Sequence, residues 1–414
     1  MSAALRVLVV HNAYQQAGGE DGVVAAEIAL LRDHGDTVVE LRRDNHEISG
    51  ITGLGRGLGN IRLAAQTLWS SATHAQALAL IEQHRPDVVH VHNTFPLISP
   101  SLYWACAQAG VPVVQTLHNF RLACPQAMFL RDGTVCESCL GKPIPWPALV
   151  HGCYRGSRVQ TAAVVGMLAL HRGLKTFETQ VTRYIALNAF CRDKFIAAGL
   201  PAQRIAIKPN FAEVPASAPA ATPAAAATAP RAGLLFVGRL AAEKGIDVLA
   251  RAWPELAGLR PGSAFGLRVA GSGAAGAALE GLAGVTLLGR QSAAQIQHEM
   301  QSAIALVMPS TWYENFPLTL VEAFGAGLPV IASRIGALAE LVEDGVTGLL
   351  FEPGNAVDLA RVMRWAADHP QQMAAMGARA RLRFDARYTP AINYRQLRAI
   401  YADAIDAQRG ESAA

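Results

Sequence analysis

The chain lacks long apolar runs and shows no sign of secretion. Although 51% of its 414 residues are hydrophobic, none lies in the ~18 consecutive apolar residues that a membrane-spanning helix needs. Residues 1–10 lack the layout of a secretory signal peptide, so the six cysteines are not expected to form disulfides. We therefore expect a cytoplasmic protein, either soluble or peripheral at the inner face of the cell membrane.

The chain also lacks a strong net charge. Its formal charge of +4 gives no indication of a nucleic-acid partner, and none is expected. The distribution is uneven, because residues 118–208 hold twelve Lys/Arg against four Asp/Glu. This excess indicates either solvated helix faces or a surface that touches anionic lipid or an acidic substrate.

The first half of the chain alternates apolar runs with helical patterns. A helical pattern over 23–35, closed by a glycine, follows the first apolar run. Buried strands separated by helices predict a doubly wound parallel sheet with right-handed crossovers. The strands are expected at 5–10, 37–41, 87–92, 112–118 and 183–188.

Composition divides the chain near its middle. Residues 214–231 are almost entirely alanine and proline, which predicts a linker, and the strand–helix alternation then restarts. The fold class expected is α/β, with two Rossmann-like doubly wound parallel-sheet domains facing across a cleft at the carboxyl ends of their strands. We predict an acceptor-side domain at 1–213 with a Cys-rich insertion near 119–160, a linker at 214–231, a nucleotide-sugar domain at 232–385, and a C-terminal helix at 386–414 that packs back on the first domain.

A glycine motif in the second half suggests a dinucleotide site that its context disfavours. Gly271 to Gly276 fits G-x-G-x-x-G after a predicted strand. A dinucleotide fingerprint also needs a carboxylate at the end of the next strand, but that strand ends in Gly289-Arg290. The motif also follows the second strand of its domain rather than the first.

Two cations follow the first strand of the second domain. Arg239 and Lys244 lie between the strand at 233–238 and a helix predicted from Ile246. A guanidinium and an ammonium beside a helix N-terminus suit phosphate oxygens. The alternative is a surface ion pair of Arg239 with Glu243.

Two glutamates eight residues apart flank a predicted helix start. Pro317 suits the first helical turn, which places Glu314 in the preceding loop and Glu322 inside the helix. The N–H groups of Leu318 and Thr319 then point out of the helix end, so carboxylates flank an anion-binding site. This arrangement suits a nucleotide sugar, with hydroxyls at both ends and a pyrophosphate between them.

On these residues the chain resembles the family-4 retaining glycosyltransferases. Their E-x7-E hallmark is matched by Glu314 and Glu322, which the resemblance assigns to the donor sugar and the ribose. Arg239 and Lys244 match the family's pyrophosphate-binding pair, and His118 its active-site histidine near the sugar.

Further matches and one departure complete the resemblance. Gly18 and Gly19, which could also form a plain turn, match the N-terminal glycine loop. Gly271 belongs to the family's own G-x-G. The usual E-G-F-G start is changed to Glu314, Asn315, Phe316 and Pro317, and a proline cannot donate a backbone hydrogen bond. The resemblance assigns donor binding to Gly18, Gly19, Arg239, Lys244, Gly271, Glu314, Asn315, Phe316, Leu318, Thr319 and Glu322, and catalysis to His118, Glu314, Arg239 and Lys244.

The resemblance implies transfer of a sugar from a nucleotide diphosphate sugar, with retained configuration and without a catalytic metal or other cofactor. The expected acceptor is a glycan or a lipid-linked glycan in cell-surface polysaccharide synthesis, at or near an anionic membrane surface. Two alternatives stay open: a nucleotide-sugar epimerase or hydrolase of the same fold, and a non-catalytic nucleotide-sugar-binding subunit.

Four cysteines cluster in the predicted insertion. One C-x-x-C with a cysteine on each side provides four thiolates, enough for a tetrahedral structural zinc site. The alternative is a set of unligated buried thiols. The residues are Cys124, Cys136, Cys139 and Cys153.

Overall fold

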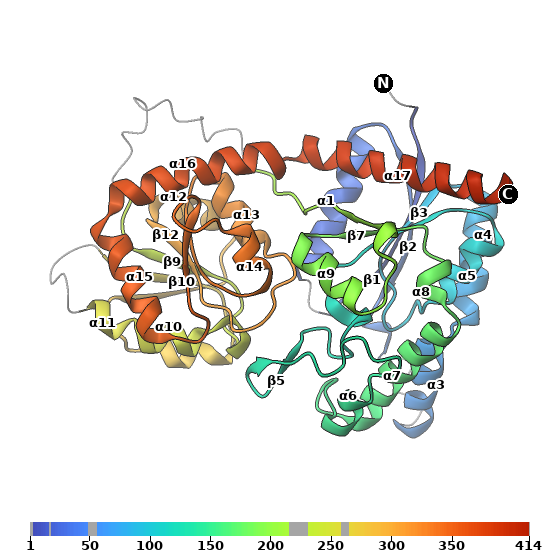
Figure 1. Ribbon diagram of the computed structural model, residues 1–414, viewed down its shortest axis with the longest axis horizontal. Helices are drawn as coiled ribbons and strands as arrows, with labels where there is room; N and C mark the ends of the chain where they lie inside the picture. The colour runs from blue at the N-terminus through green and yellow to red at the C-terminus, as the bar shows by residue number, and fades with distance from the viewer. Residues whose placement is uncertain (1–2, 16–17, 49–55, 215–230, 258–264, 414) are drawn as a thin grey trace. The chain divides into compact units, whose positions relative to one another are not determined.

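The computed structural model describes residues 3–15, 18–48, 56–214, 231–257 and 265–413. The chain forms two compact units (Figure 1). The first comprises Met1–Phe129, Cys136–Asn210 and Asn393–Ala414, and the second Leu130–Val135 and Phe211–Ile392. The linker predicted at 214–231 falls almost wholly outside the described residues.

The first unit is built on a six-stranded parallel sheet in the order β2-β1-β3-β4-β7-β8. β3 and β4 are buried along their whole length, which explains why they read as continuous apolar runs in the sequence. The strands are β1 (Arg6–Ala13), β2 (Thr37–Asp44), β3 (Val88–Asn93), β4 (Val113–Thr116), β7 (Arg183–Ala186) and β8 (Ile205–Ile207).

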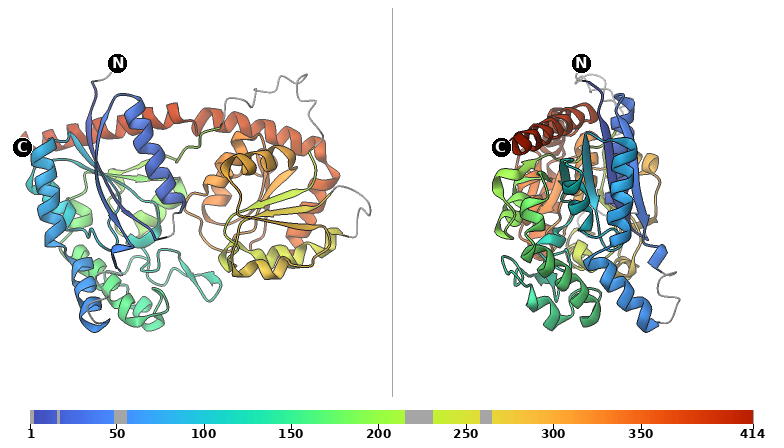
Figure 2. Two further views of the ribbon diagram at one scale, coloured as in Figure 1. Left: turned by 180° about the vertical axis from the view of Figure 1, so that it is seen from behind. Right: turned by 90° about the vertical axis from the view of Figure 1, so that its right-hand side faces the viewer.

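Helices from both ends of the chain cover this sheet (Figures 1 and 2). The last helix, α17, packs Leu397, Tyr401 and Ala404 into one core with residues of α1 and β1. The helices of the unit are α1 (Gly19–Asp33), α3 (Arg56–Leu68), α4 (Ser71–His84), α5 (Ser101–Gln108), α6 (Trp146–His151), α7 (Arg158–Gly173), α8 (Thr176–Thr179), α9 (Ala189–Ala197) and α17 (Pro390–Ala413).

The second unit contains a six-stranded parallel sheet in the order β11-β10-β9-β12-β13-β14. Its strands are β9 (Leu234–Val237), β10 (Leu267–Ala270), β11 (Val285–Gly289), β12 (Ala305–Met308), β13 (Val330–Ser333) and β14 (Gly348–Phe351). Its helices are α10 (Ile246–Ala252), α11 (Pro254–Ala257), α12 (Ala293–Ser302), α13 (Leu318–Gly325), α14 (Gly336–Leu341), α15 (Ala356–Asp368) and α16 (Pro370–Arg387), and it also holds the hairpin β5 (Leu130–Arg131) and β6 (Thr134–Val135).

The two sheets confirm the predicted α/β class but differ in strand order. In the first, the chain reverses direction across the sheet between β1 and β3, and in the second between β9 and β12. Such switch points are where ligands bind in open α/β sheets. Among the described residues, no helix is long and apolar enough to cross a membrane.

Candidate active site

The switch point of the second sheet brings a lysine and a glutamate together. Lys244 follows β9 and Glu314 follows β12, and the ammonium donates to Glu314 Oε1 at 2.6 Å. Ser310 Oγ donates to the same oxygen at 2.7 Å. Burial alone would raise the pKa of Glu314, but Lys244, together with hydrogen bonds from Ser310 and Trp312, outweighs it and holds that pKa below the ordinary value. The carboxylate of Glu314 is therefore ionised and forms an ion pair with Lys244.

Arg239 has a carboxylate partner of its own. Its guanidinium donates to Glu243 at 3.1 Å, while 69% of its side chain stays exposed. Each cation of the predicted phosphate site therefore has a carboxylate as its partner. The exposed Arg239 pair is weak and readily exchanged for another anion.

The helix after Glu314 begins one residue later than predicted. Pro317 is the capping residue (φ −78°, ψ 108°) and Leu318 is the first residue of α13. Since the ring of Pro317 cannot supply a side-chain cap, the first N–H groups need other partners. Among the described residues, the N–H groups of Leu318 and Thr319 have none, whereas Leu320 donates to Pro317 O. Phe316 packs edge-on to Tyr388, with ring centroids 6.2 Å apart.

Glu322 lies in α13, one turn beyond these N–H groups. Its side chain is partly buried, and that burial raises the pKa of its carboxyl. Unlike Glu314, it has no cation as a partner among the described residues. The two glutamates of the predicted pair therefore have opposite electrostatic environments.

The glycines after β10 are required by packing. A Cβ on Gly271 would collide with the carbonyl oxygen of Gly238, and one on Gly273 with that of Leu240. Both glycines have strongly positive φ angles, +147° and +152°. The G-x-G therefore lets the loop after β10 lie directly on the loop after β9, which carries Arg239.

In the first unit the glycine loop leads into α1. Gly18 is the capping residue of this helix, and its N–H donates to Asp21 at 2.9 Å. Next to it, Glu20 accepts hydrogen bonds from Tyr14 (3.0 Å) and Asn119 (3.3 Å) through one oxygen. Its other oxygen is buried and has no partner among the described residues, and burial raises the pKa of Glu20 to about 7.

His118 follows β4 and contacts a buried histidine. Its Nε2 lies 2.8 Å from His92 Nδ1, with the two rings nearly parallel at 21°. Burial lowers the pKa of His118 to about 3 and that of His92 well below its ordinary value. Both rings are therefore neutral near pH 7.

Behind these rings lies a buried charged network that the sequence analysis missed. Glu27 of α1 accepts from Lys208 at 2.9 Å, and its other oxygen faces His90 (3.1 Å) and His92 (3.5 Å). Tyr401 of α17 lies 2.7 Å from His90. A sequence signal existed: alternate histidines in the apolar strand DVVHVH, and a glutamate within the apolar helix VVAAEIALL.

The four cysteines of the insertion lie in one neighbourhood without forming a compact ligand set. Cys139 packs with Cys153 in a small apolar cluster, and burial together with the other three thiols raises its pKa to about 11. Cys136 Sγ contacts Ser138 instead. Among the described residues, potential metal ligands converge within 4.8 Å at Glu27, His90 and His92 rather than at these thiols.

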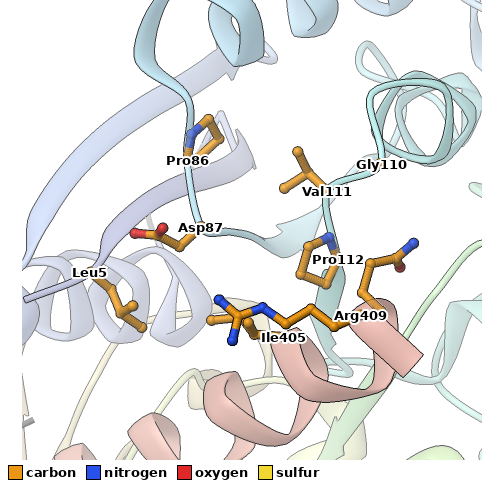
Figure 3. A pocket seen from close by; sticks show the side chains of 9 residues that line it. Leu5, Pro86, Asp87, Gly110, Val111, Pro112, Ile405 and Arg409 are labelled. Atoms are coloured by element: carbon orange, nitrogen blue, oxygen red, sulfur yellow. The ribbon is translucent and has the colours of Figure 1, made fainter. Parts of the chain in front are cut away.

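A separate pocket lies at the opposite, amino-terminal ends of the first sheet's strands (Figure 3). Its volume is about 510 Å³, and it is lined by Leu5, Asp87 and Pro112 before β1, β3 and β4 and by Ile405 and Arg409 of α17. None of the predicted site residues borders it.

Comparison with known proteins identifies the family. The model for "Glycosyl transferase 4-like domain" matches residues 13–210, and that for "Glycosyl transferases group 1" matches residues 231–369. The chain belongs to the group 1, or family-4, glycosyltransferases. The first match covers most of the first unit, and the second covers the sheet that carries Lys244 and Glu314.

Individual relatives of this glycosyltransferase are distant or matched in part. It is 36% identical over 172 residues to a Mycobacterium tuberculosis glycogen synthase and 35% over 188 residues to an Arthrobacter D-inositol 3-phosphate glycosyltransferase. Those segments span 39% and 42% of this chain and 41% and 44% of the relatives' own lengths.

Solved structures of similar fold cover nearly the whole chain. The structure of HepE from Anabaena with UDP superposes with a TM-score of 0.64 at 17% identity over 96% of this chain and 100% of HepE. A Rickettsia africae glycosyltransferase superposes with a TM-score of 0.65 at 15% identity, over 98% of this chain and 99% of that protein. At these identities the likeness shows the GT-B fold.

Proposed function

We propose that the protein is a retaining glycosyltransferase that moves a sugar from a nucleoside diphosphate sugar to a glycan or lipid-linked acceptor. The observation that carries the proposal is the Lys244–Glu314 pair at the switch point of the second sheet. It combines a cation for phosphate, a carboxylate for sugar hydroxyls and two N–H groups at the start of α13 that have no partner within the described part of the chain. A nucleoside diphosphate sugar needs these groups, because its phosphates bind cations and N–H donors and its sugar hydroxyls bind a carboxylate.

The diphosphate is expected to replace carboxylates as the partner of both cations. Lys244 exchanges Glu314 for phosphate oxygens, and Arg239 leaves its exposed contact with Glu243. Their charges and the N–H groups of Leu318 and Thr319 then stabilise the negative charge that develops on the leaving diphosphate. This requires no metal ion.

The glutamates are expected to hold opposite ends of the donor. Glu314, once Lys244 has moved to phosphate, accepts hydrogen bonds from the sugar. Glu322, without a cation, accepts from the ribose hydroxyls. The bond from the anomeric carbon to the diphosphate oxygen breaks, the acceptor oxygen bonds to that carbon on the same face, and the acceptor's proton passes to the departing phosphate.

The first unit is proposed to bind the acceptor near an anionic membrane surface. Around α6 and α7 it exposes large apolar side chains beside basic ones: Ile144 (55%), Trp146 (56%), Val150 (52%) and Val159 (78%) are accessible, and Lys142 lies over the Trp146 ring. Apolar side chains set among cations suit the boundary of an anionic bilayer. The buried face of α7, from Thr161 to His171, belongs instead to the core.

A structural zinc ion in the insertion remains part of the proposal. The other three thiols lie close enough to contribute to the raised pKa of Cys139, and a divalent cation would stabilise such a group as thiolates. The holding residues would be Cys124, Cys136, Cys139 and Cys153. Elemental analysis of protein purified without chelator is expected to give about one zinc per chain, and less than ~0.2 would reject the site.

The test is a thermal-shift panel of nucleoside diphosphate sugars followed by product analysis. Uridine sugars come first, because HepE was solved with UDP-glucose. A donor at 100 times its dissociation constant stabilises by about 2.7 kcal/mol. A glycosylated acceptor with retained configuration is the expected product. Free sugar or an epimerised nucleotide sugar would instead identify a hydrolase or an epimerase, and binding without turnover a non-catalytic subunit.

A further inference from the structure

Three buried side chains of the first unit turn one atom each toward a common point. Glu27 Oε1 lies 3.1 Å from His90 Nδ1 and 3.5 Å from His92 Nε2. Glu27 belongs to α1, and both histidines belong to β3. All three atoms lie within 4.8 Å of one another, so the cluster can be described from the first unit alone.

Two of these atoms have no hydrogen-bond partner. Within the described part of the chain, neither Glu27 Oε1 nor His92 Nε2 makes a hydrogen bond. Leaving a buried polar atom unpaired is costly, so two such atoms that face each other indicate a point where a cation binds. Neither atom has appreciable surface that a water molecule could touch, whereas a bare metal ion needs less room.

The spacing of the cluster suits a metal ion. Nitrogen and oxygen ligands lie about 2.0–2.2 Å from a tetrahedral ion such as zinc, which places neighbouring ligand atoms roughly 3.3–3.6 Å apart. The contacts that Glu27 Oε1 makes with the two histidines, at 3.1 and 3.5 Å, are close to that value. Imidazole nitrogens are ligands that first-row transition ions favour, and a carboxylate supplies the negative charge.

The outer nitrogen of each histidine already has a partner. His90 Nε2 lies 2.8 Å from Thr116 Oγ1, and His92 Nδ1 lies 2.8 Å from His118 Nε2. Histidines that bind metals are usually held in this way, because a hydrogen bond from the outer N–H fixes the ring and leaves the inner lone pair for the ion.

Two further groups complete the surroundings of the cluster. Lys208 donates to Glu27 Oε2 at 2.9 Å, so the carboxylate offers Oε1 alone to an ion and its outer oxygen is held by a hydrogen bond. The hydroxyl of Tyr401 lies 2.7 Å from His90 Nδ1, close enough for its oxygen to become a fourth ligand.

We propose that Glu27, His90 and His92 bind one divalent first-row transition ion, with Tyr401 as the fourth ligand. Such a closed, four-coordinate site is structural, and it would join α1 and β3 to α17. Since the site is sealed in the folded chain, the ion enters before α17 packs on the sheet. The site is separate from the thiols of the insertion, and it does not rest on the function proposed above.

The test uses cobalt as the probe and a chain whose thiol cluster is disabled. Full-length Cys136→Ser/Cys139→Ser protein is produced in medium with cobalt as the added transition metal, so that the ion is present while the chain folds. Elemental analysis of all first-row transition metals should total about one ion per chain, and a total below ~0.2 would overturn the proposal. X-ray absorption at the cobalt edge should show nitrogen and oxygen neighbours. Sulfur neighbours would place the ion on the remaining thiols and would also overturn it.

A pair of histidine variants of the same protein locates the ion. His92→Phe removes one ligand and should lower the total below ~0.2 ion per chain. His171→Phe is the matched control, because His171 is another buried histidine of the first unit but contacts Thr176 and the carbonyl of Leu68. The control should keep its ion. A folded His92→Phe protein that also keeps it, or a loss in both variants, would refute the site.

The outcomes remain decisive if His92→Phe does not fold. The metal total and the absorption spectrum of the chain with an intact cluster then decide alone. A chain that holds the ion on nitrogen and oxygen but transfers no sugar would refute the function proposed above and leave this site standing.

Discussion

In the first unit, the side chains of Lys208 and Glu27 form an ion pair that is 1% and 3% exposed, whereas those of Lys244 and Glu314 in the second are 20% and 6% exposed. In each pair the lysine follows a strand, β8 or β9, and the fold around the sheet brings a glutamate close to it. The first is also held by Asn393 and faced by two histidines, and its near-complete burial shields it from solvent. The second has an edge open to solvent.

This difference separates two uses of the same chemistry. A sealed ion pair cannot exchange partners, so it is suited to fixing the orientation of its neighbours. A pair that solvent reaches can give up one partner to an incoming anion at small cost. The first of the four experiments below tests this division, and the other three extend the comparison between the two units.

The largest effect is expected from Lys208→Met. Glu27 would remain buried without its cation, which should destabilise the protein by about 3–5 kcal/mol. The matched variant Lys244→Met, whose glutamate keeps Ser310 as a donor, should lose about 1 kcal/mol or less. Urea denaturation followed by tryptophan fluorescence measures both. Equal losses would show that the two pairs do not differ as described.

A second effect concerns Glu20, whose pKa burial raises to about 7. Between pH ~4.5 and ~7 the unfolded chain ionises this group while the folded chain keeps it protonated, so folding stability falls as pH rises, by about 3 kcal/mol in total. Glu20→Gln should remove that decline. The measurement is the free energy of unfolding across this pH range, with exposed Glu82→Gln as control. An unchanged slope in Glu20→Gln would mean that this carboxyl ionises normally.

The two glutamates of the second unit should differ in binding and turnover. Glu322→Gln should weaken nucleoside diphosphate binding about tenfold or more, since a charge-assisted hydrogen bond to ribose contributes ~1.5–3 kcal/mol. Glu314→Gln should mainly lower kcat and leave that affinity unchanged or tighter, because it releases Lys244 for phosphate.

Calorimetric titration with the free nucleotide, set beside initial rates, measures both variants. The assignment is wrong if Glu314→Gln loses nucleotide affinity as strongly as Glu322→Gln. It is equally wrong if neither variant changes turnover.

The smallest effect concerns the apolar and basic surface around α6 and α7. The full-length protein should bind anionic vesicles more tightly than neutral ones, less so at high salt, with each basic side chain near the surface contributing about 1 kcal/mol. Val159→Ser should weaken this binding. Val357→Ser in the second unit is the matched control, since these valines are 78% and 79% exposed. Equal sedimentation with both vesicle types would remove the membrane from the proposal.

The sequence predicted the parallel sheets because their central strands are continuous apolar runs between helical patterns. It missed the edge strands β8 and β14, and β8 has only three residues, too few to show a periodic pattern. Pairing across the sheet, and not the residues themselves, defines such short strands.

Site residues were predictable where they follow a strand and match a spaced motif, as Lys244 and Glu314 do. The buried network was not, because its members come together only in the folded chain. Lys208 and Glu27 are 181 residues apart, and Tyr401 and His90 are 311 apart. Nothing in the local pattern of one residue identifies its partner at that distance.

The packing of α17 has a consequence for how the chain acquires its structure during synthesis. Leu397, Tyr401 and Ala404 complete the core around β1, and Asn393 and Tyr401 supply partners to Lys208 and His90. A nascent chain emerging from the ribosome must therefore be synthesised past Ala404, close to the end of its 414 residues, before the unit that began first can finish its interior. The second unit, whose core from Leu234 to Met376 is contiguous in the chain, can mature earlier. The first unit is thus translated first but completed last. Its sheet stays partly solvated until α17 has been synthesised.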